Sequence, residues 1–144
     1  MSSGETNLPA LLKSMKPSLD PETFVFGHIP YESAEGIQDV VNLLASAAKA
    51  TQMLFQEDEG WSVILPETQT ENLQIRPVFR CRKITLNVHS SLDAVGFLAI
   101  ITTRLTELGV GVNPVSAYFH DHLFVPEGKE NVVMEALRDL SKET

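Results

Sequence analysis

The stretch that decides the fold is residues 84–126, ITLNVHSSLDAVGFLAIITTRLTELGVGVNPVSAYFHDHLFVP. Its first five residues alternate apolar and polar side chains, as a strand with one buried face does. SSLD at residues 90–93 predicts a helix start, because a serine cap precedes an acid, and Gly109 predicts the left-handed end of that helix. The expected buried face has four apolar residues at helical spacing: Leu98, Ile101, Leu105 and Leu108. The stretch therefore predicts a strand followed by an amphipathic helix.

Two more strands and a second helix follow. Residues 110–119 and 123–125 are strand-like, and the His120-Asp121-His122 segment between them predicts a hairpin turn. Pro126 predicts the start of a helix, because its missing N–H would be unpaired in a first turn anyway. The apolar face of this helix is Val132, Val133, Ala136, Leu137 and Leu140.

The preceding residues predict the same order of elements. A strand is expected at residues 23–29, a helix at 36–48, a hairpin at 52–65 and a short helix ending near residue 74. Residues 78–88 predict two strands that meet at Arg82-Lys83. The expected face of the longer helix is Ile37, Val40, Val41, Leu44 and Ala48.

An amphipathic helix is expected at the start of the chain, over residues 8–15. Its apolar face is Leu8, Leu11, Leu12 and Met15. Pro17 and Pro21 predict that this helix ends in a linker.

The two halves align without a gap at an offset of 60 residues. ILPE at residues 64–67 matches FVPE at 124–127, and Gly36 matches Gly96. An internal duplication explains this repeated order. The predicted fold class is α+β, with tandem ferredoxin-like split βαβ units whose antiparallel sheets carry helices on one face. The predicted parts are an N-terminal helix and linker (residues 1–22), a first unit (23–82) and a second unit (83–144).

The second unit runs out of sequence before its fourth strand. That strand is either absent or supplied from elsewhere, and unpaired sheet edges invite pairing. We therefore expect either one continuous sheet through both halves or a homodimer that covers an edge.

Composition excludes several classes of partner. The net charge is −8 and the eleven basic residues are scattered, whereas nucleic-acid-binding proteins show a basic face. Residues 1–6 lack the pattern of a signal peptide, and no apolar run reaches the roughly 20 residues that span a bilayer. The single cysteine, Cys81, excludes an intrachain disulfide. The sequence predicts a cytoplasmic protein with neither nucleic-acid nor membrane partners.

Residues 84–126 resemble the ACT domain. The segments VHSSLDAVG (residues 88–96) and YFHDHLFV (118–125) are similar to those of a family of uncharacterised bacterial ACT-domain proteins, related to the paired regulatory ACT domains of aspartate kinases. The resemblance covers nearly the whole chain. It implies tandem ACT-like units with a regulatory or sensory role, no enzyme activity, and binding of a small molecule, usually an amino acid, between two ACT copies.

The resemblance also implies a ligand site, at the loop between the first strand and first helix and at the facing strand. The expected ligand-binding residues are Ser90, Ser91, Leu92, Asp93, Ala94, Val95, Gly96, Val112, Asn113, Pro114 and Val115. Independently, the free N–H groups of a helix start would attract a carboxylate, and Asp93 could accept hydrogen bonds from an ammonium group. Ser90, Ser91 and Asp93 could instead serve only as helix caps, and Gly96 only in packing.

Other constellations are less specific. His120 and His122 could ligate a metal with Asp121, but a hairpin turn explains these residues better. Ser90 and Ser91 lack a nucleophile motif, and no phosphate-binding loop is present. We predict no catalytic residue, metal or cofactor. The alternative to a ligand sensor is a module for dimerisation or protein interaction that binds no ligand.

Overall fold

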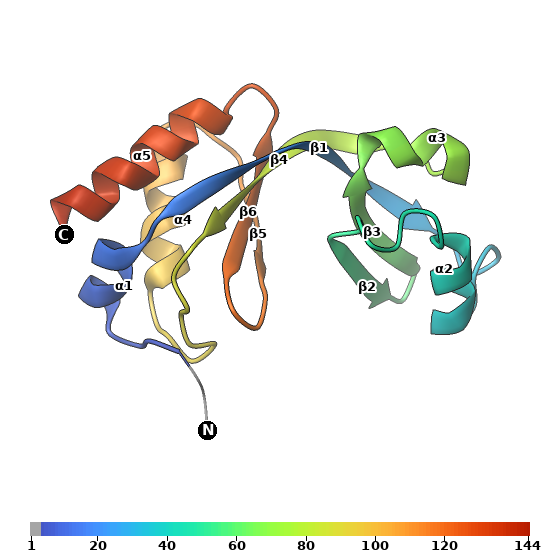
Figure 1. Cartoon of the computed structure of the whole chain (residues 1–144), viewed down its shortest axis with the longest axis horizontal. Coiled ribbons are helices and arrows are strands. Elements are labelled where there is room, and N and C mark those ends of the chain that lie inside the picture. The colour runs from blue at the N-terminus through green and yellow to red at the C-terminus, as the bar shows by residue number, and fades with distance from the viewer. Residues whose placement is uncertain (1–3) are drawn as a thin grey trace. The chain divides into compact units, whose positions relative to one another are not determined.

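The computed structural model describes residues 4–144 and divides into two compact units (Figure 1). Unit 2 is Glu22–Cys81, and unit 1 joins the described residues up to Pro21 to Arg82–Thr144. Residues 1–3 of the expected N-terminal segment lie outside the description. The elements in chain order are α1 (Leu8–Ser14), β1 (Pro17–Ile29), α2 (Ile37–Leu43), β2 (Met53–Glu57), β3 (Gly60–Pro66), a 3-10 turn η1 (Glu67–Gln69), α3 (Thr70–Leu73), β4 (Val78–Leu86), α4 (Phe97–Glu107), β5 (Asn113–Ser116), β6 (Asp121–Pro126) and α5 (Glu130–Glu143).

The strands hydrogen-bond in the order β2-β3-β1-β4-β6-β5. Strands β1 and β4 each cross the boundary between the units, so each serves in both. Unit 2 contains β2, β3, the second part of β1 and the first part of β4. Unit 1 contains the first part of β1, the second part of β4, β6 and β5. Each unit thus has the strand order of a ferredoxin-like split βαβ fold, as expected.

The first part of β1 supplies the fourth strand of unit 1. The linker expected at Pro17 and Pro21 is therefore wrong, because both residues belong to β1. The register between β1 and β3 runs from Phe24 to Ile29, so both prolines precede it. A proline is tolerated at the start or the free edge of a strand, since no ladder bond needs its N–H there.

Strand β4 runs unbroken where the sequence suggested two strands meeting at Arg82-Lys83. The predicted meeting point instead coincides with the change of unit, between Cys81 and Arg82. Arg82 is held there by Glu130, with 3.0 Å between Nη1 and Oε2, and its Nη2 donates to the carbonyl of Asp20 at 2.9 Å. The charge of Arg82 thus has a partner although the residue lies in a strand interior.

Helices α1, α4 and α5 form the helical layer of unit 1 and enclose its core. The core contains Leu86 and Leu123 from the sheet, Leu11 from α1, Ile101 from α4 and Leu137 from α5, all 0% exposed. The predicted helix faces are thus largely confirmed. Leu108 and Val132 are exceptions, because both are nearly half exposed. The helix start predicted at Pro126 is wrong, because Pro126 ends β6 and α5 begins at Glu130.

Helix α4 begins at Phe97, so the helix start predicted at residues 90–93 is wrong. Ser91 Oγ accepts a hydrogen bond from the Asp93 N–H at 3.1 Å, and the carbonyl of Ser91 accepts from Ala94. The serine therefore stabilises a turn instead of capping the helix. Gly96, at φ +91°, provides the left-handed step into α4, and Gly109 ends it at φ +71° as predicted.

Unit 2 buries a smaller core between its sheet and α2 and α3. Helix α2 stops at Leu43, short of the predicted residue 48, because the chain continues in turns with bonds such as Ala47 N–H to the Leu44 carbonyl. Val40 and Leu44 are buried as expected, but Ile37, Val41 and Ala48 are exposed. The hairpin β2–β3 is confirmed, with Glu57 opposite Gly60.

Candidate functional site

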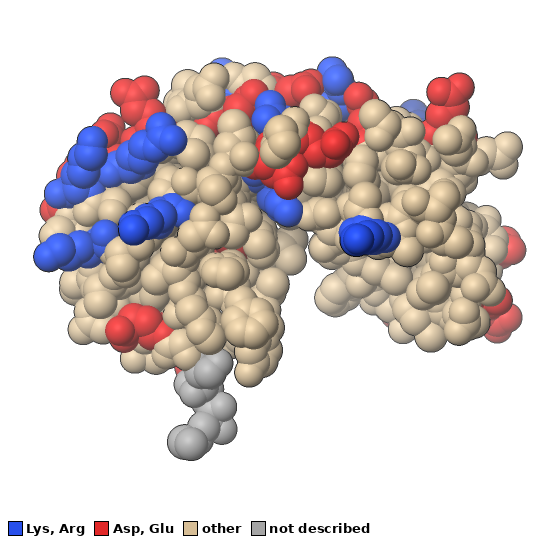
Figure 2. Space-filling view, in the orientation of Figure 1, with Lys and Arg blue, Asp and Glu red and all other residues tan. Residues whose placement is uncertain are grey.

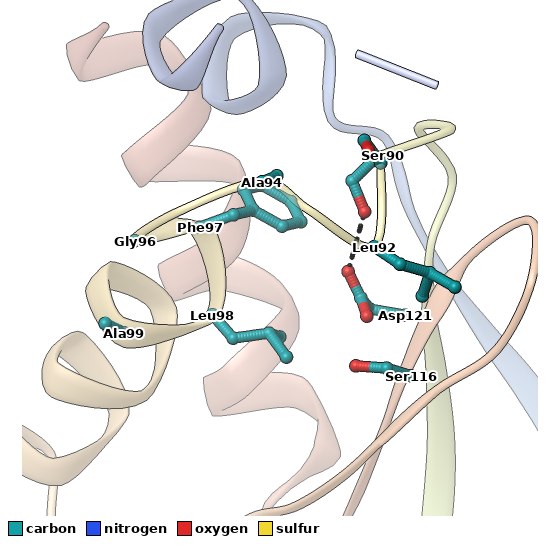
Figure 3. A pocket seen from close by; sticks show the side chains of 10 residues that line it. Ser90, Leu92, Ala94, Gly96, Phe97, Leu98, Ala99, Ser116 and Asp121 are labelled. Atoms are coloured by element: carbon teal, nitrogen blue, oxygen red, sulfur yellow. Dashed lines mark hydrogen bonds between the residues drawn. The ribbon is translucent and has the colours of Figure 1, made fainter. Parts of the chain in front are cut away.

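A cavity of about 210 Å³ lies in unit 1, at the start of α4 (Figure 3). The loop after β4 forms one wall, the first turn of α4 another, and the adjoining ends of β5 and β6 the third. The lining residues are Ser90, Ser91, Leu92, Ala94, Gly96, Phe97, Leu98, Ala99, Ser116 and Asp121. All of them belong to unit 1, so the unit carries the cavity by itself.

A buried carboxylate is the main polar group of the cavity. Asp121 is 7% exposed, and Ser90 Oγ donates a hydrogen bond to its Oδ2 at 2.9 Å. Asp121 is the first residue of β6, and Leu123 and Val125, which share its side of the pleated strand, belong to the core beneath the helices. The carboxylate therefore points to the helical side of the sheet, where Figure 3 shows it beside Ser90 and near Ser116.

The first turn of α4 supplies partial positive charge to the same cavity. Gly96 is the N-cap and provides no side-chain cap, while its carbonyl accepts the first helical bond from Ile100 at 3.0 Å. The N–H groups of Phe97, Leu98 and Ala99 precede that bond, so no intrahelical acceptor exists for them. The macrodipole adds to their positive potential. A carboxylate in the cavity would be stabilised there.

The N-terminal segment fixes the wall that carries Ser90. Glu5 N–H donates to the carbonyl of His89, and Ser91 N–H donates to the carbonyl of Glu5, each at 2.8 Å. Gly4 lies so close that a Cβ atom there would meet the backbone of His89 and Ser91 at 2.8 Å. Ser90 is thus presented to Asp121 by backbone pairing with a segment more than eighty residues earlier in the chain.

The structure brings together only part of the predicted ligand site. Five of the expected residues line the cavity: Ser90, Ser91, Leu92, Ala94 and Gly96. Asp93 and Val95 lie in the same loop but are exposed, and they do not line the cavity. On the facing strand, Val112 packs against the core and Val115 is half-buried, whereas Asn113 and Pro114 are exposed. The adjacent Ser116 is the residue of β5 that lines the cavity.

Asp121 is the site residue that sequence reasoning missed. The predicted turn at His120-Asp121-His122 is displaced, because the turn closes between the Ala117 N–H and the His120 carbonyl at 3.0 Å, and β6 begins at Asp121. The alternation of Asp121 with Leu123 and Val125 was the available signal for its inward direction. Phe97, Leu98 and Ala99 were missed because the helix was expected to start earlier.

The two histidines of this segment do not form a metal site with Asp121. Asp121 bonds Ser90, whereas His122 Nδ1 lies 2.9 Å from Thr85 Oγ1 on the neighbouring strand. Within residues 4–144, no three His, Cys, Asp or Glu side chains are placed to hold a metal ion. His89, which precedes Ser90, packs with the rings of Tyr118 and Phe119.

The charges of unit 1 do not form a continuous basic face in the view of Figure 2. Lys and Arg gather where Figure 1 draws α4 and α5, with Asp and Glu beside them. Arg104 pairs with Glu143 at 2.7 Å across these two helices. None of the helices between residues 4 and 144 is long and apolar enough to cross a membrane.

Fold and cavity together define the class: a tandem of ferredoxin-like units with a small cavity at the first strand-to-helix loop of one unit. One ACT-domain model matches residues 3–82 and another matches residues 78–139. The chain therefore belongs to the ACT-domain family and carries two ACT domains in tandem. ACT domains are regulatory modules that bind small molecules, and neither match indicates a catalytic family.

Solved structures extend the comparison. A Vibrio cholerae protein of unknown function, described as a possible transport protein, is 30% identical with a TM-score of 0.77, over 96% of this chain and 99% of that one. The ligand-free regulatory subunit of aspartate kinase from Thermus thermophilus is 11% identical with a TM-score of 0.68, over 90% and 97%. Clostridium acetobutylicum aspartate kinase is 9% identical with a TM-score of 0.70, over 94% of this chain and 36% of that one. The two kinase likenesses show a shared fold. A search of curated proteins gives no match.

Proposed function

We propose that this protein is a regulatory sensor that binds a free amino acid in the cavity of unit 1. One observation carries the proposal: the buried carboxylate of Asp121 lines the same small cavity as the first residues of α4, whose N–H groups have no acceptor within the helix. The first attracts a cation and the second attracts an anion. An amino acid carries both charges within one small molecule.

Each end of the zwitterion has a defined partner. The ammonium group donates hydrogen bonds to Asp121, whose orientation is fixed by the Ser90 hydroxyl at 2.9 Å. The carboxylate accepts hydrogen bonds from the N–H groups of Leu98 and Ala99. Charge-assisted hydrogen bonds of this kind are roughly twice as strong as neutral ones. Asp121 takes the role first considered for Asp93, because Asp93 lies outside the lining.

A second function is favoured by a different observation. Tyr118 and Phe119 are 64% and 59% exposed, and their ring centroids lie 4.8 Å apart on the β5–β6 loop. Leu92, which lines the cavity, is 67% exposed. Exposed aromatic residues are enriched at protein interfaces. This surface could serve for dimerisation or partner binding without any ligand.

The proposal is tested by thermal unfolding of the full chain with three probes: alanine, propionate and ethylamine. Alanine at about 100 times its Kd should stabilise the fold by about 2.7 kcal/mol. For a chain of this length, that corresponds to a rise in Tm of about 5–10 °C. Propionate and ethylamine each lack one charged end, so both should give much smaller shifts at equal concentration.

Variants locate the site. Asp121→Asn should abolish the alanine-induced shift, because the ammonium loses its counter-charge. Asp139→Asn makes the same change of charge on the exposed side of α5 and should leave the shift intact. A panel of amino acids without any shift would refute the sensor and leave the interaction module. A shift that persists in Asp121→Asn would place the ligand elsewhere.

A further inference from the structure

The walls of the cavity between its two charged ends are neutral. Leu92, Ala94, Phe97, Leu98 and Ala99 are apolar, and Ser116 adds a hydroxyl. No Lys, Arg or Glu side chain lines the cavity, and Asp121 is its single ionisable group. A ligand with a third charge would therefore bury that charge without a partner, which is unfavourable.

The volume limits the size of the ligand. The cavity has a volume of about 210 Å³ and is partly open to solvent at Leu92, which is 67% exposed. It is smaller than the ~300–1,000 Å³ of pockets that accept drug-sized ligands. An amino acid with a side chain of one to three heavy atoms fills this space, whereas a large aromatic side chain would extend out of it past Leu92.

Unit 2 fills the equivalent position with its own tryptophan. Trp61 stands 60 residues before Asp121, and the partners across the hairpins correspond as well, Gln56 for Trp61 and Ser116 for Asp121. Trp61 is 5% exposed, and its Nε1 donates to the carbonyl of Ala34 at 3.0 Å. Ala34 corresponds to Ala94, a cavity residue of unit 1. Within unit 2, the Trp61 indole therefore lies where the equivalent residues of unit 1 line the cavity.

We infer that each chain binds one ligand, in unit 1, and that the site selects amino acids with small uncharged side chains. The inference rests on the proposed function, because it presumes that the cavity binds an amino acid. Asp121 sets the binding mode, and the apolar walls set the selectivity. At the position of Asp121, unit 2 has the buried indole of Trp61 in place of a carboxylate.

Isothermal titration of the full chain tests both parts of the inference. Alanine, serine and threonine should bind at least tenfold more tightly than lysine, glutamate and tryptophan, with about one ligand per chain. If lysine or glutamate binds as tightly as alanine and Asp121→Asn abolishes it, the selectivity is wrong but the sensor stands. About two ligands per chain would overturn the single site. Absence of binding by all six would overturn the sensor itself.

A variant of the wall separates selectivity from folding. Leu98→Ala enlarges the cavity and should shift the preference toward leucine, raising the affinity for leucine relative to alanine at least fivefold. Val132→Ala shortens an exposed side chain of α5 and should leave both affinities unchanged. An unaltered ratio in Leu98→Ala, with a circular dichroism spectrum like that of the original chain, would show that this wall does not select the ligand.

Discussion

Burial keeps the Cys81 thiol protonated and protects it from reagents. Cys81 is 0% exposed, its Sγ donates to the carbonyl of Phe24 at 3.4 Å, and desolvation raises its pKa from 9.0 to about 12. Because the thiolate is the reactive form, we expect a disulfide reagent at pH 8 to modify the folded protein at least a hundredfold more slowly than the protein in urea. Absorbance of the released chromophore measures both rates. Equal rates would contradict the burial.

The same pKa shift predicts a loss of stability in alkali. Between pH 9 and 12, the unfolded chain loses the Cys81 proton while the folded chain keeps it. The free energy of unfolding should therefore fall as the pH rises through this interval. Urea titrations at pH 8, 9 and 10 should show a steeper decline for the original chain than for Cys81→Ala.

His122 predicts the opposite trend in acid. Desolvation lowers its pKa from the ordinary 6.5, Lys83 and His120 lower it further, and Asp121 partly opposes them. The unfolded chain therefore takes up a proton at a pH where the folded chain does not. The free energy of unfolding should fall as the pH drops below about 6.5. His122→Gln cannot titrate, so its urea midpoint should depend less on pH between 7 and 5; an identical dependence would refute the role of His122.

Residue positions in the site were only partly readable from the sequence. The loop residues Ser90 to Gly96 were identified through a family resemblance, and the structure places most of them around the cavity. The alternation of Asp121 with Leu123 and Val125 indicates its inward direction, but no periodicity reports its hydrogen bond to Ser90, which is 31 residues away. A short pattern such as HDH shows which residues are present but not which side of the strand each one faces.

At the scale of single elements, α5 tests how far one helix stabilises unit 1. Leu137 is 0% exposed in the core, whereas Val132 on the same helix is 46% exposed. Leu137→Ala should lower the free energy of unfolding by about 2–5 kcal/mol, because it leaves a cavity. Val132→Ala should change it by less than about 0.5 kcal/mol. Urea unfolding followed by circular dichroism measures both, and similar costs would contradict the assigned face.

Helix faces were easier to predict than helix ends. The spacing of Ile101 and Leu105 identified the buried side of α4, because a period of 3.6 residues is a property of the sequence itself. Its start was misplaced because the SSLD pattern is typical of both a helix cap and a turn. The helix begins only after Gly96, whose φ is positive. The end of α2 was misplaced because its run of alanines gives no stop signal.

At the scale of the whole molecule, the shared strands predict that the two units unfold together. Strands β1 and β4 each contribute residues to both units, so neither unit keeps four strands when the other unfolds. Trp61, the only tryptophan, reports on unit 2 by fluorescence. Leu137→Ala in unit 1 should shift the Trp61 transition in urea by as much as it shifts circular dichroism. A Trp61 transition that stays in place would show independent units.

The order of elements was predictable from the duplication. The continuous sheet was one of two alternatives that the sequence left open, and the source of the missing strand was not predictable. Two prolines in β1 gave a signal that is ambiguous between a linker and an edge strand. Only the strands that pair with β1 distinguish a linker from an edge strand, and these strands, β3 and β4, lie far away in the sequence.

The sharing of strands between units also determines which fragments of the chain could fold by themselves. A gene fragment encoding residues 83–144 alone would leave its sheet one strand short, since that strand begins at Pro17. A half-length chain of this design would complete itself by lending its end to a second copy, as domain-swapped dimers do. The tandem chain makes the same exchange within one polypeptide, because β1 and β4 each contribute residues to both units.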